Sequence, residues 1–168
     1  MYKIGDFIIK ANTGVCKITD ISCLDISGID SNTLYYHLLP LGDKKTIIYI
    51  PKASAHLTIR KMMTKEEALE LIHLAGQVDN LDISNDKFRE QKYRELLKHN
   101  SPIELLQIIK TTYLRKKSRT DQGKKCTSAD ESYFKLAEKL LLSELCIVLE
   151  KSADEIRELL KLSLLINQ

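Results

Sequence analysis

The segment TIRKMMTKEEA (residues 58–68) marks the change from a strand pattern to a helix pattern. Before it, residues 1–60 contain no Glu, and their apolar residues come in short runs rich in β-branched and aromatic side chains. Directly after it, Thr64 and Glu67 have capping-box spacing, in which the Thr hydroxyl accepts from a backbone N–H of the first helical turn and the Glu side chain reaches back to the cap residue. The sequence therefore predicts two parts of different structural class, residues 1–61 and 62–168.

The first part has five short strand candidates separated by clusters of Gly, Pro, Asn, Asp and Ser. They are residues 4–9, 15–21, 34–39, 46–50 and 56–59. A sheet this small must curl to cover its apolar face and protect its edges. We therefore expect a small antiparallel β-barrel.

The second part has recurring helix-start signals. Capping-box patterns recur at residues 128–131 and 152–155, and Ser101-Pro102 suits a helix start, with Ser as the cap and Pro in the first turn. A further helix is expected over residues 84–98. These patterns predict an all-α bundle of about five helices, which makes the whole chain an α+β protein.

No catalytic or metal-binding pattern stands out in the sequence. The four His residues lack zinc-ligand spacing, and there is no catalytic-serine or phosphate-loop motif. A zinc site built from His37, His56 and Cys16 would need the strands to bring together ligands that are far apart in sequence. We therefore expect no enzyme activity, no metal and no cofactor, and we expect the four Cys residues to be free thiols.

Length and charge set wider limits. The chain has 168 residues and a net charge of +3, too small an excess to indicate an acidic partner by itself. No apolar run approaches the ~20 residues that span a membrane, and the first residues lack a signal-peptide pattern. The sequence therefore predicts a cytoplasmic protein with no membrane partner.

Two basic segments are candidates for contact with nucleic acid. The first is broken by one acid, Asp121, and contains Lys110, Arg115, Lys116, Lys117, Arg119, Lys124 and Lys125. Closely spaced cations can contact phosphates and release counterions together. The alternative is a solvated helix end whose cations complement the negative end of the helix dipole.

The second segment contains Lys87, Phe88, Arg89 and Lys92. An aromatic ring among cations can wedge against a base step in a minor groove. The alternative is that Phe88 packs internally with the apolar residues of its own helix.

Taken together, these segments resemble the CarD/CdnL family of bacterial transcription regulators that bind RNA polymerase. The resemblance covers about residues 2–150. Its C-terminal part comprises YRELLK at 93–98, RKK at 115–117, GKK at 123–125, SADE at 128–131, AEKLL at 137–141 and EL at 144–145. Its N-terminal part comprises IGDFII at 4–9, GV at 14–15, YY at 35–36, IP at 50–51 and Arg60.

The chain departs from the family pattern at two places. After the first strand the family usually reads Y-P-x-H-G-V-G, and here only the Gly-Val at residues 14–15 is kept. The family often carries a Trp wedge in the second helix of its C-terminal half. This chain has no Trp, and Phe88 is the aromatic residue nearest to the position that the Trp occupies in the family pattern.

The resemblance implies a non-enzymatic, nucleoid-associated regulator that acts as a monomer. Residues 1–61 would form a Tudor-like barrel that docks on the RNA polymerase β subunit through the strand at 46–50, with Thr46, Ile48, Tyr49 and Lys52 as contact residues. Residues 62–168 would contact upstream promoter DNA through its backbone and minor groove, and so stabilise the open complex. The alternatives are a protein-interaction module without a DNA role and, from another class, a metal- or thiol-dependent enzyme.

Overall fold

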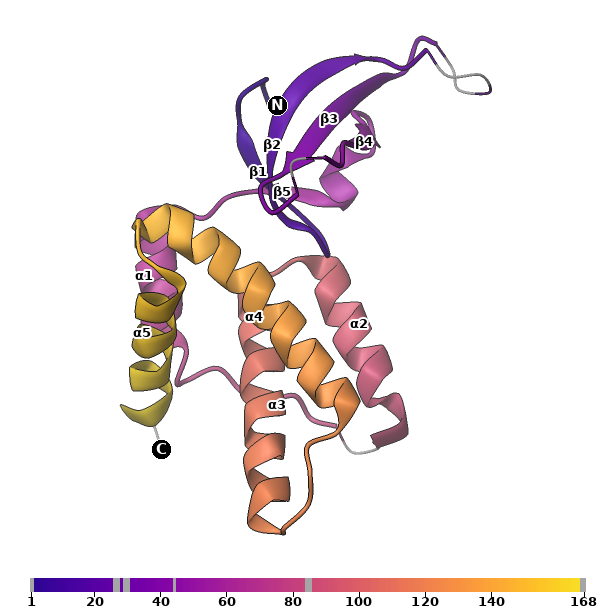
Figure 1. The fold of residues 1–168 in the computed structure, drawn as a ribbon. Helices are drawn as coiled ribbons and strands as arrows, with labels where there is room; N and C mark the ends of the chain where they lie inside the picture. Colours follow the sequence, from indigo (N-terminus) through magenta and orange to yellow (C-terminus); the bar gives the residue numbers. More distant parts are fainter. Residues whose placement is uncertain (1, 26–27, 29–30, 44, 84–85, 167–168) are drawn as a thin grey trace. The chain divides into compact units, whose positions relative to one another are not determined.

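The computed structural model describes residues 2–25, 28, 31–43, 45–83 and 86–166 (Figure 1). The chain forms two compact units, Met1–Met62 and Met63–Gln168, here called the N-terminal unit and the helical unit. No helix in the described ranges combines the length and the apolar character that a membrane crossing requires.

The N-terminal unit is one antiparallel sheet that confirms the predicted fold class. Its elements are β1 (Phe7–Lys10), β2 (Gly14–Cys23), β3 (Leu34–Pro40), β4 (Ile48–Pro51), the 3-10 turn η1 (Ala55–Leu57) and β5 (Ile59–Lys61). The strand order is β4-β3-β2-β1-β5, so β4 and β5 form the two edges of a curled half-barrel. Its concave face buries the side chains of Ile8, Cys16, Ile18, Tyr36, Leu38, Ile50, Ala55 and Ile59.

Three predicted strands differ from the observed ones. The strand expected at 4–9 begins at Phe7, because residues 4 and 5 form a turn in which Gly5 has a φ of 95°. The strand expected at 56–59 is wrong, because residues 55–57 form η1 and pairing with β1 begins at Ile59, opposite Lys10. The strand expected at 46–50 begins at Ile48 instead, because the Thr46 hydroxyl is bonded to the Asp43 carboxylate in the preceding turn.

The helical unit contains the five predicted α-helices around one apolar core. They are α1 (Lys65–Leu74), α2 (Arg89–His99), α3 (Pro102–Asp121), α4 (Ser128–Leu149) and α5 (Ala153–Ile166), with the 3-10 turn η2 (Asp86–Phe88) before α2. The largest fully buried apolar side chains in its core are Tyr93, Ile108, Leu141, Leu145 and Ile156. Each of the five α-helices packs its buried face against this core.

The helix starts follow the predicted caps with two differences. The boxes at Thr64 and Ser152 are confirmed, since each hydroxyl accepts from the N–H three residues on. At α4 the cap is Thr127 rather than Ser128: its hydroxyl accepts from the Asp130 N–H at 3.2 Å. The helix expected over 84–98 begins at Arg89; residues 84–85 lie outside the described residues, and residues 86–88 form η2.

Candidate functional sites

The outer edge of β4 carries backbone groups that the sheet does not use. The Lys52 N–H donates to the Leu34 carbonyl at 2.8 Å, so this pair lies on a hydrogen-bonded rung between β4 and β3. Because antiparallel rungs alternate, the N–H and C=O of Tyr49 point away from β3. Pro51 lies two residues after Tyr49, so its backbone also faces away from β3. The N–H that proline lacks is therefore not needed for a hydrogen bond within the sheet.

Tyr49 is held on the convex face of the sheet by a neighbour on β3. The rings of His37 and Tyr49 meet edge to face, with centroids 4.8 Å apart. The His37 Nε2 atom lies 3.2 Å from the Ser22 hydroxyl, which donates to the Asp20 carboxylate at 2.7 Å. This hydrogen bond and one from the Ile21 backbone N–H lower the pKa of Asp20. The cluster fixes Tyr49 beside the free edge, with 44% of its surface exposed.

The other predicted docking residues lie around this edge in different roles. The Ile48 side chain packs against the core of the N-terminal unit. Lys52 follows the end of β4 and is half-buried, and Thr46 is exposed in the turn before the strand. Of the four predicted residues, Tyr49 alone combines an exposed large side chain with an outward-facing backbone.

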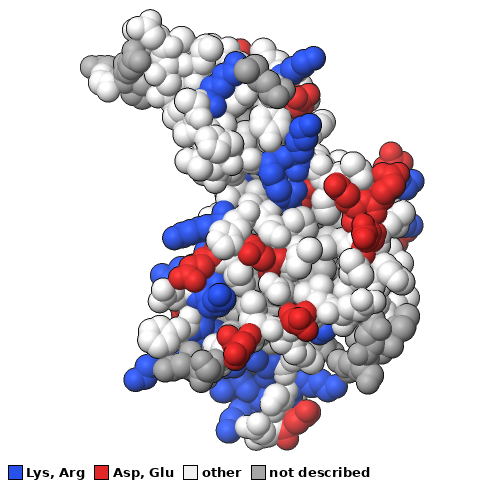
Figure 2. Space-filling model, turned by 180° about the vertical axis from the view of Figure 1, so that it is seen from behind, with Lys and Arg blue, Asp and Glu red and all other residues white. Residues whose placement is uncertain are grey.

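The predicted basic segments come together at one end of the helical unit. The turn η2, the C-terminal end of α3 and the start of α4 lie at this end (Figure 1), and Lys and Arg side chains gather there (Figure 2). Its exposed cations are Lys87, Lys92, Lys116, Lys117, Lys124 and Lys125. We call this surface the basic end.

Two of the predicted DNA-contacting arginines are held by a buried carboxylate. Arg89 Nε lies 2.9 Å from Asp130 Oδ1, and Arg115 Nε lies 3.4 Å from Asp130 Oδ2. The hydroxyls of Tyr93 and Thr127 also donate to this carboxylate, at 3.3 and 2.7 Å. Burial, followed by the nearby Asp130 charge, raises the pKa of Tyr93. We call these five residues the Asp130 cluster.

The Asp130 cluster changes how the basic segments are interpreted. Arg89 is only 8% exposed, so its guanidinium group faces the interior rather than the basic end. Arg115 is partly exposed but directed to the same carboxylate. Lys110, within the first basic segment, donates to the carbonyls of Gly76 and Val78 at 2.8 and 2.7 Å, beyond the end of α1. Part of the basic pattern therefore stabilises the fold.

Phe88 lies directly before Arg89 and faces outward. Its side chain is 62% exposed, so the alternative of internal packing does not describe this residue. Because Arg89 is anchored on Asp130, the neighbouring ring is presented from a fixed point at the start of α2.

Comparison with known proteins identifies the N-terminal unit. Residues 2–63 match the family model described as CarD-like/TRCF RID domain. The N-terminal unit is a CarD-like domain. Domains of this family bind the RNA polymerase β subunit and are interaction domains, not known enzymes. No curated protein matches the chain.

The match ends where the helical unit begins, so the CarD-like domain corresponds to the curled sheet with its free β4 edge. In the described residues, no group of three or more His, Cys, Asp or Glu is placed to hold a metal ion. All four Cys residues are free thiols, and burial raises the pKa of Cys16 to about 11.

Sequence reasoning treated Asp130 only as part of a helix cap and missed its contacts with arginines. The available signal was an acidic residue three positions after Thr127, in a chain where Arg89 and Arg115 precede it on two other helices. Nothing in the linear order showed that these arginines converge on one carboxylate.

We predict that Asp130→Asn lowers the free energy of unfolding by about 3 kcal/mol or more, because it leaves two guanidinium groups without their buried counter-charge. The measurement is chemical denaturation of the full chain. The matched control is Glu131→Gln, the same chemical change at the exposed neighbour, for which we expect a change within about 0.5 kcal/mol. Equal effects of the two variants would contradict a structural role for Asp130.

Proposed function

We propose that this RNA-polymerase-interacting protein regulates transcription by binding the polymerase β subunit through β4 and promoter DNA through the basic end of its helical unit. The match of residues 2–63 to the CarD-like domain carries the polymerase half of the proposal. The exposed lysines and Phe88 at the basic end support the DNA half.

Docking on polymerase is proposed to occur by strand addition. An unpaired edge strand can accept a strand from a partner, with backbone hydrogen bonds supplying affinity and alternate side chains supplying specificity. The outward N–H and C=O of Tyr49 provide the first such backbone groups, and the Tyr49 ring provides an apolar contact beside them.

Stabilisation of the open complex needs no catalysis. A protein that binds polymerase on melted DNA more tightly than polymerase on closed DNA shifts that equilibrium by its differential affinity. Lysine contacts to phosphates supply sequence-independent affinity, and an inserted aromatic ring supplies preference for DNA that is already distorted.

We predict that Tyr49→Pro weakens binding of the full chain to the isolated β subunit by tenfold or more. Proline removes the outward N–H, but the Tyr49–His37 pair is not a hydrogen-bonded rung, so the β3 ladder is kept. Binding would be measured by biolayer interferometry and folding by circular dichroism.

Tyr49→Ala is the control for this prediction, since it removes the ring but keeps the N–H. We expect it to weaken binding less than proline does. If a folded Tyr49→Pro variant binds as tightly as the natural protein, β4 is not the docking edge.

We predict that replacing the lysines of α3 and the α3–α4 connection with Gln weakens binding to duplex promoter DNA and reduces its salt dependence. These are Lys116, Lys117, Lys124 and Lys125. Removal of one lysine–phosphate interaction should reduce the slope of log K against log salt by about 0.9. Fluorescence anisotropy over a salt series would measure both quantities.

A charge-matched control replaces four exposed lysines on other parts of the helical unit with Gln. These are Lys65, Lys98, Lys139 and Lys161. An equal decrease of slope in both variants would mean that overall charge, and not the basic end, governs DNA affinity.

We predict that Phe88→Ala shortens the lifetime of the open complex while changing the free energy of unfolding by no more than about 0.5 kcal/mol, because the ring is exposed. Phe88→Trp should lengthen the lifetime, because indole has a larger face and an N–H donor for a groove acceptor. A lifetime unaffected by both substitutions would rule out a wedge at this position.

One observation favours a second candidate function, a polymerase-binding module without a DNA role. Arg89, Arg115 and Lys110 are engaged within the helical unit, which reduces the number of cations available to phosphates. The lysine series separates the two functions, because a module of this kind would show no salt-dependent DNA affinity.

A further inference from the structure

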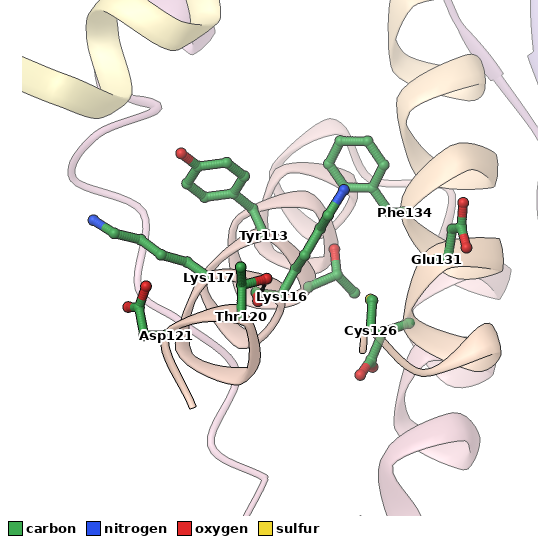
Figure 3. A pocket seen from close by; sticks show the side chains of 10 residues that line it. Tyr113, Lys116, Lys117, Thr120, Asp121, Cys126, Glu131 and Phe134 are labelled. Atoms are coloured by element: carbon green, nitrogen blue, oxygen red, sulfur yellow. Dashed lines mark hydrogen bonds between the residues drawn. The ribbon is translucent and has the colours of Figure 1, made fainter. Parts of the chain in front are cut away.

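We propose that the hollow between α3 and α4 binds a nucleotide, with the base against aromatic side chains and the phosphate on lysines. The hollow has a volume of about 420 Å³. Its lining includes Tyr113, Lys116, Lys117, Thr120, Cys126 and Phe134 (Figure 3). Pockets for small molecules commonly measure about 300–1,000 Å³, so this volume suits one nucleotide.

The threonines of the lining leave no hydroxyl hydrogen for a ligand. The Thr112 hydroxyl donates to the Ile108 carbonyl at 2.7 Å, and the Thr120 hydroxyl donates to the Lys116 carbonyl at 2.9 Å. Both bonds turn the hydroxyl back onto α3, so these side chains contribute mainly carbon surface to the wall of the hollow.

Two carboxylates at the α4 side of the hollow are also engaged. Asp130 is held by Arg89 and Arg115, as described above. Glu131 pairs with Lys135 at 2.8 Å, and this contact lowers the pKa of Glu131. Asp130 and Glu131 are thus paired with cations outside the hollow, and Lys116 in the lining adds positive charge near Glu131, which reduces the repulsion of an anionic ligand.

The groups that remain available are two amines and two rings. Among the described residues, no partner lies within hydrogen-bond or ion-pair distance of the amine of Lys116 or Lys117, although the charge of Lys116 contributes to lowering the pKa of Glu131. The Tyr113 ring is 46% exposed, on the same helix as both lysines. Phe134 faces this side of α3 from α4 (Figure 3). Ammonium groups beside partly exposed aromatic rings are complementary to a ligand that is both anionic and planar.

A nucleotide is the ligand class with this chemistry. Its phosphate can bind lysine ammonium groups, and its base can stack on an aromatic ring whatever its sequence. The carboxylate of Asp121, one turn after Lys117, adds an acceptor for the amino group of a base. Because adenine, guanine and cytosine carry such an amino group and thymine does not, we expect thymine nucleotides to bind least tightly.

The nucleotide could be supplied free in solution or as an unpaired residue of single-stranded DNA. Both sources present a base and a phosphate to the same side chains. The second source would connect the hollow to the DNA contact proposed above, and the first would be independent of it.

The test is calorimetric titration of the full chain with the four deoxynucleoside monophosphates, with a short single strand, and with the duplex of the same sequence. We expect the three amino-bearing monophosphates, or the single strand, to bind more tightly than dTMP. Tyr113→Ala should weaken this binding at least about fivefold, the lower limit for loss of one base–aromatic stack. Tyr113→Phe, which keeps the stacking ring, should retain it.

The phosphate half of the site is tested with Lys116→Gln and Lys117→Gln. Both should weaken binding of monophosphates more than binding of the matching nucleosides, while Lys139→Gln, on the exposed side of α4, should change neither. Binding of the single strand alone, abolished by Tyr113→Ala, supports the proposal and assigns the nucleotide to DNA.

Two results would overturn the nucleotide site: no binding of any monophosphate or single strand at millimolar concentration, or binding that Tyr113→Ala leaves unchanged. Duplex binding that persists in either case would leave the proposed regulatory function standing. Monophosphate binding that Tyr113→Ala weakens, in a chain that shows no salt-dependent affinity for duplex promoter DNA, would overturn the DNA half of the proposed function and leave the nucleotide site standing.

Discussion

The buried carboxylate of Asp130 is the interaction on which the architecture of the helical unit depends. A charge that is 1% exposed is costly unless it is paired and hydrogen-bonded, and Asp130 has two arginines and two hydroxyls around it. Its partners come from the start of α2, from α3 and from the residue that caps α4. One carboxylate therefore fixes the relative positions of the three helix segments that form the basic end.

This constraint links stability to the proposed function. Arg89 is anchored inside, and Phe88, its neighbour in sequence, is exposed outside. Arg115 is directed inward, while Lys116 and Lys117 on the next positions of α3 stay exposed. Adjacent residues thus divide between structural and surface roles, and the division follows from which side of each helix faces Asp130.

The N-terminal unit works through a different constraint, the edge of its sheet. A half-barrel leaves two edge strands, and natural proteins usually protect such edges because they pair readily with other chains. On β4 the backbones of Tyr49 and Pro51 face away from β3. Tyr49 offers an N–H to a partner strand, and Pro51 has none to offer. The match to the CarD-like domain supports the proposal that this open edge binds the RNA polymerase β subunit.

Local signals in the sequence were enough for the α+β class, the five helices, four of the strands and the caps at Thr64 and Ser152, because propensity, periodicity and capping act between near neighbours. The pairing of β5 with β1 from Ile59 and the inward direction of Arg89 depended on contacts between distant residues. The α4 cap at Thr127 is itself a local contact, with Asp130 three residues on, and was misplaced by one residue. The sequence alone does not distinguish a basic residue that contacts phosphate from one that pairs with a buried carboxylate. Its role is settled by what the folded chain places beside it, since a buried charge must find its counter-charge within the fold.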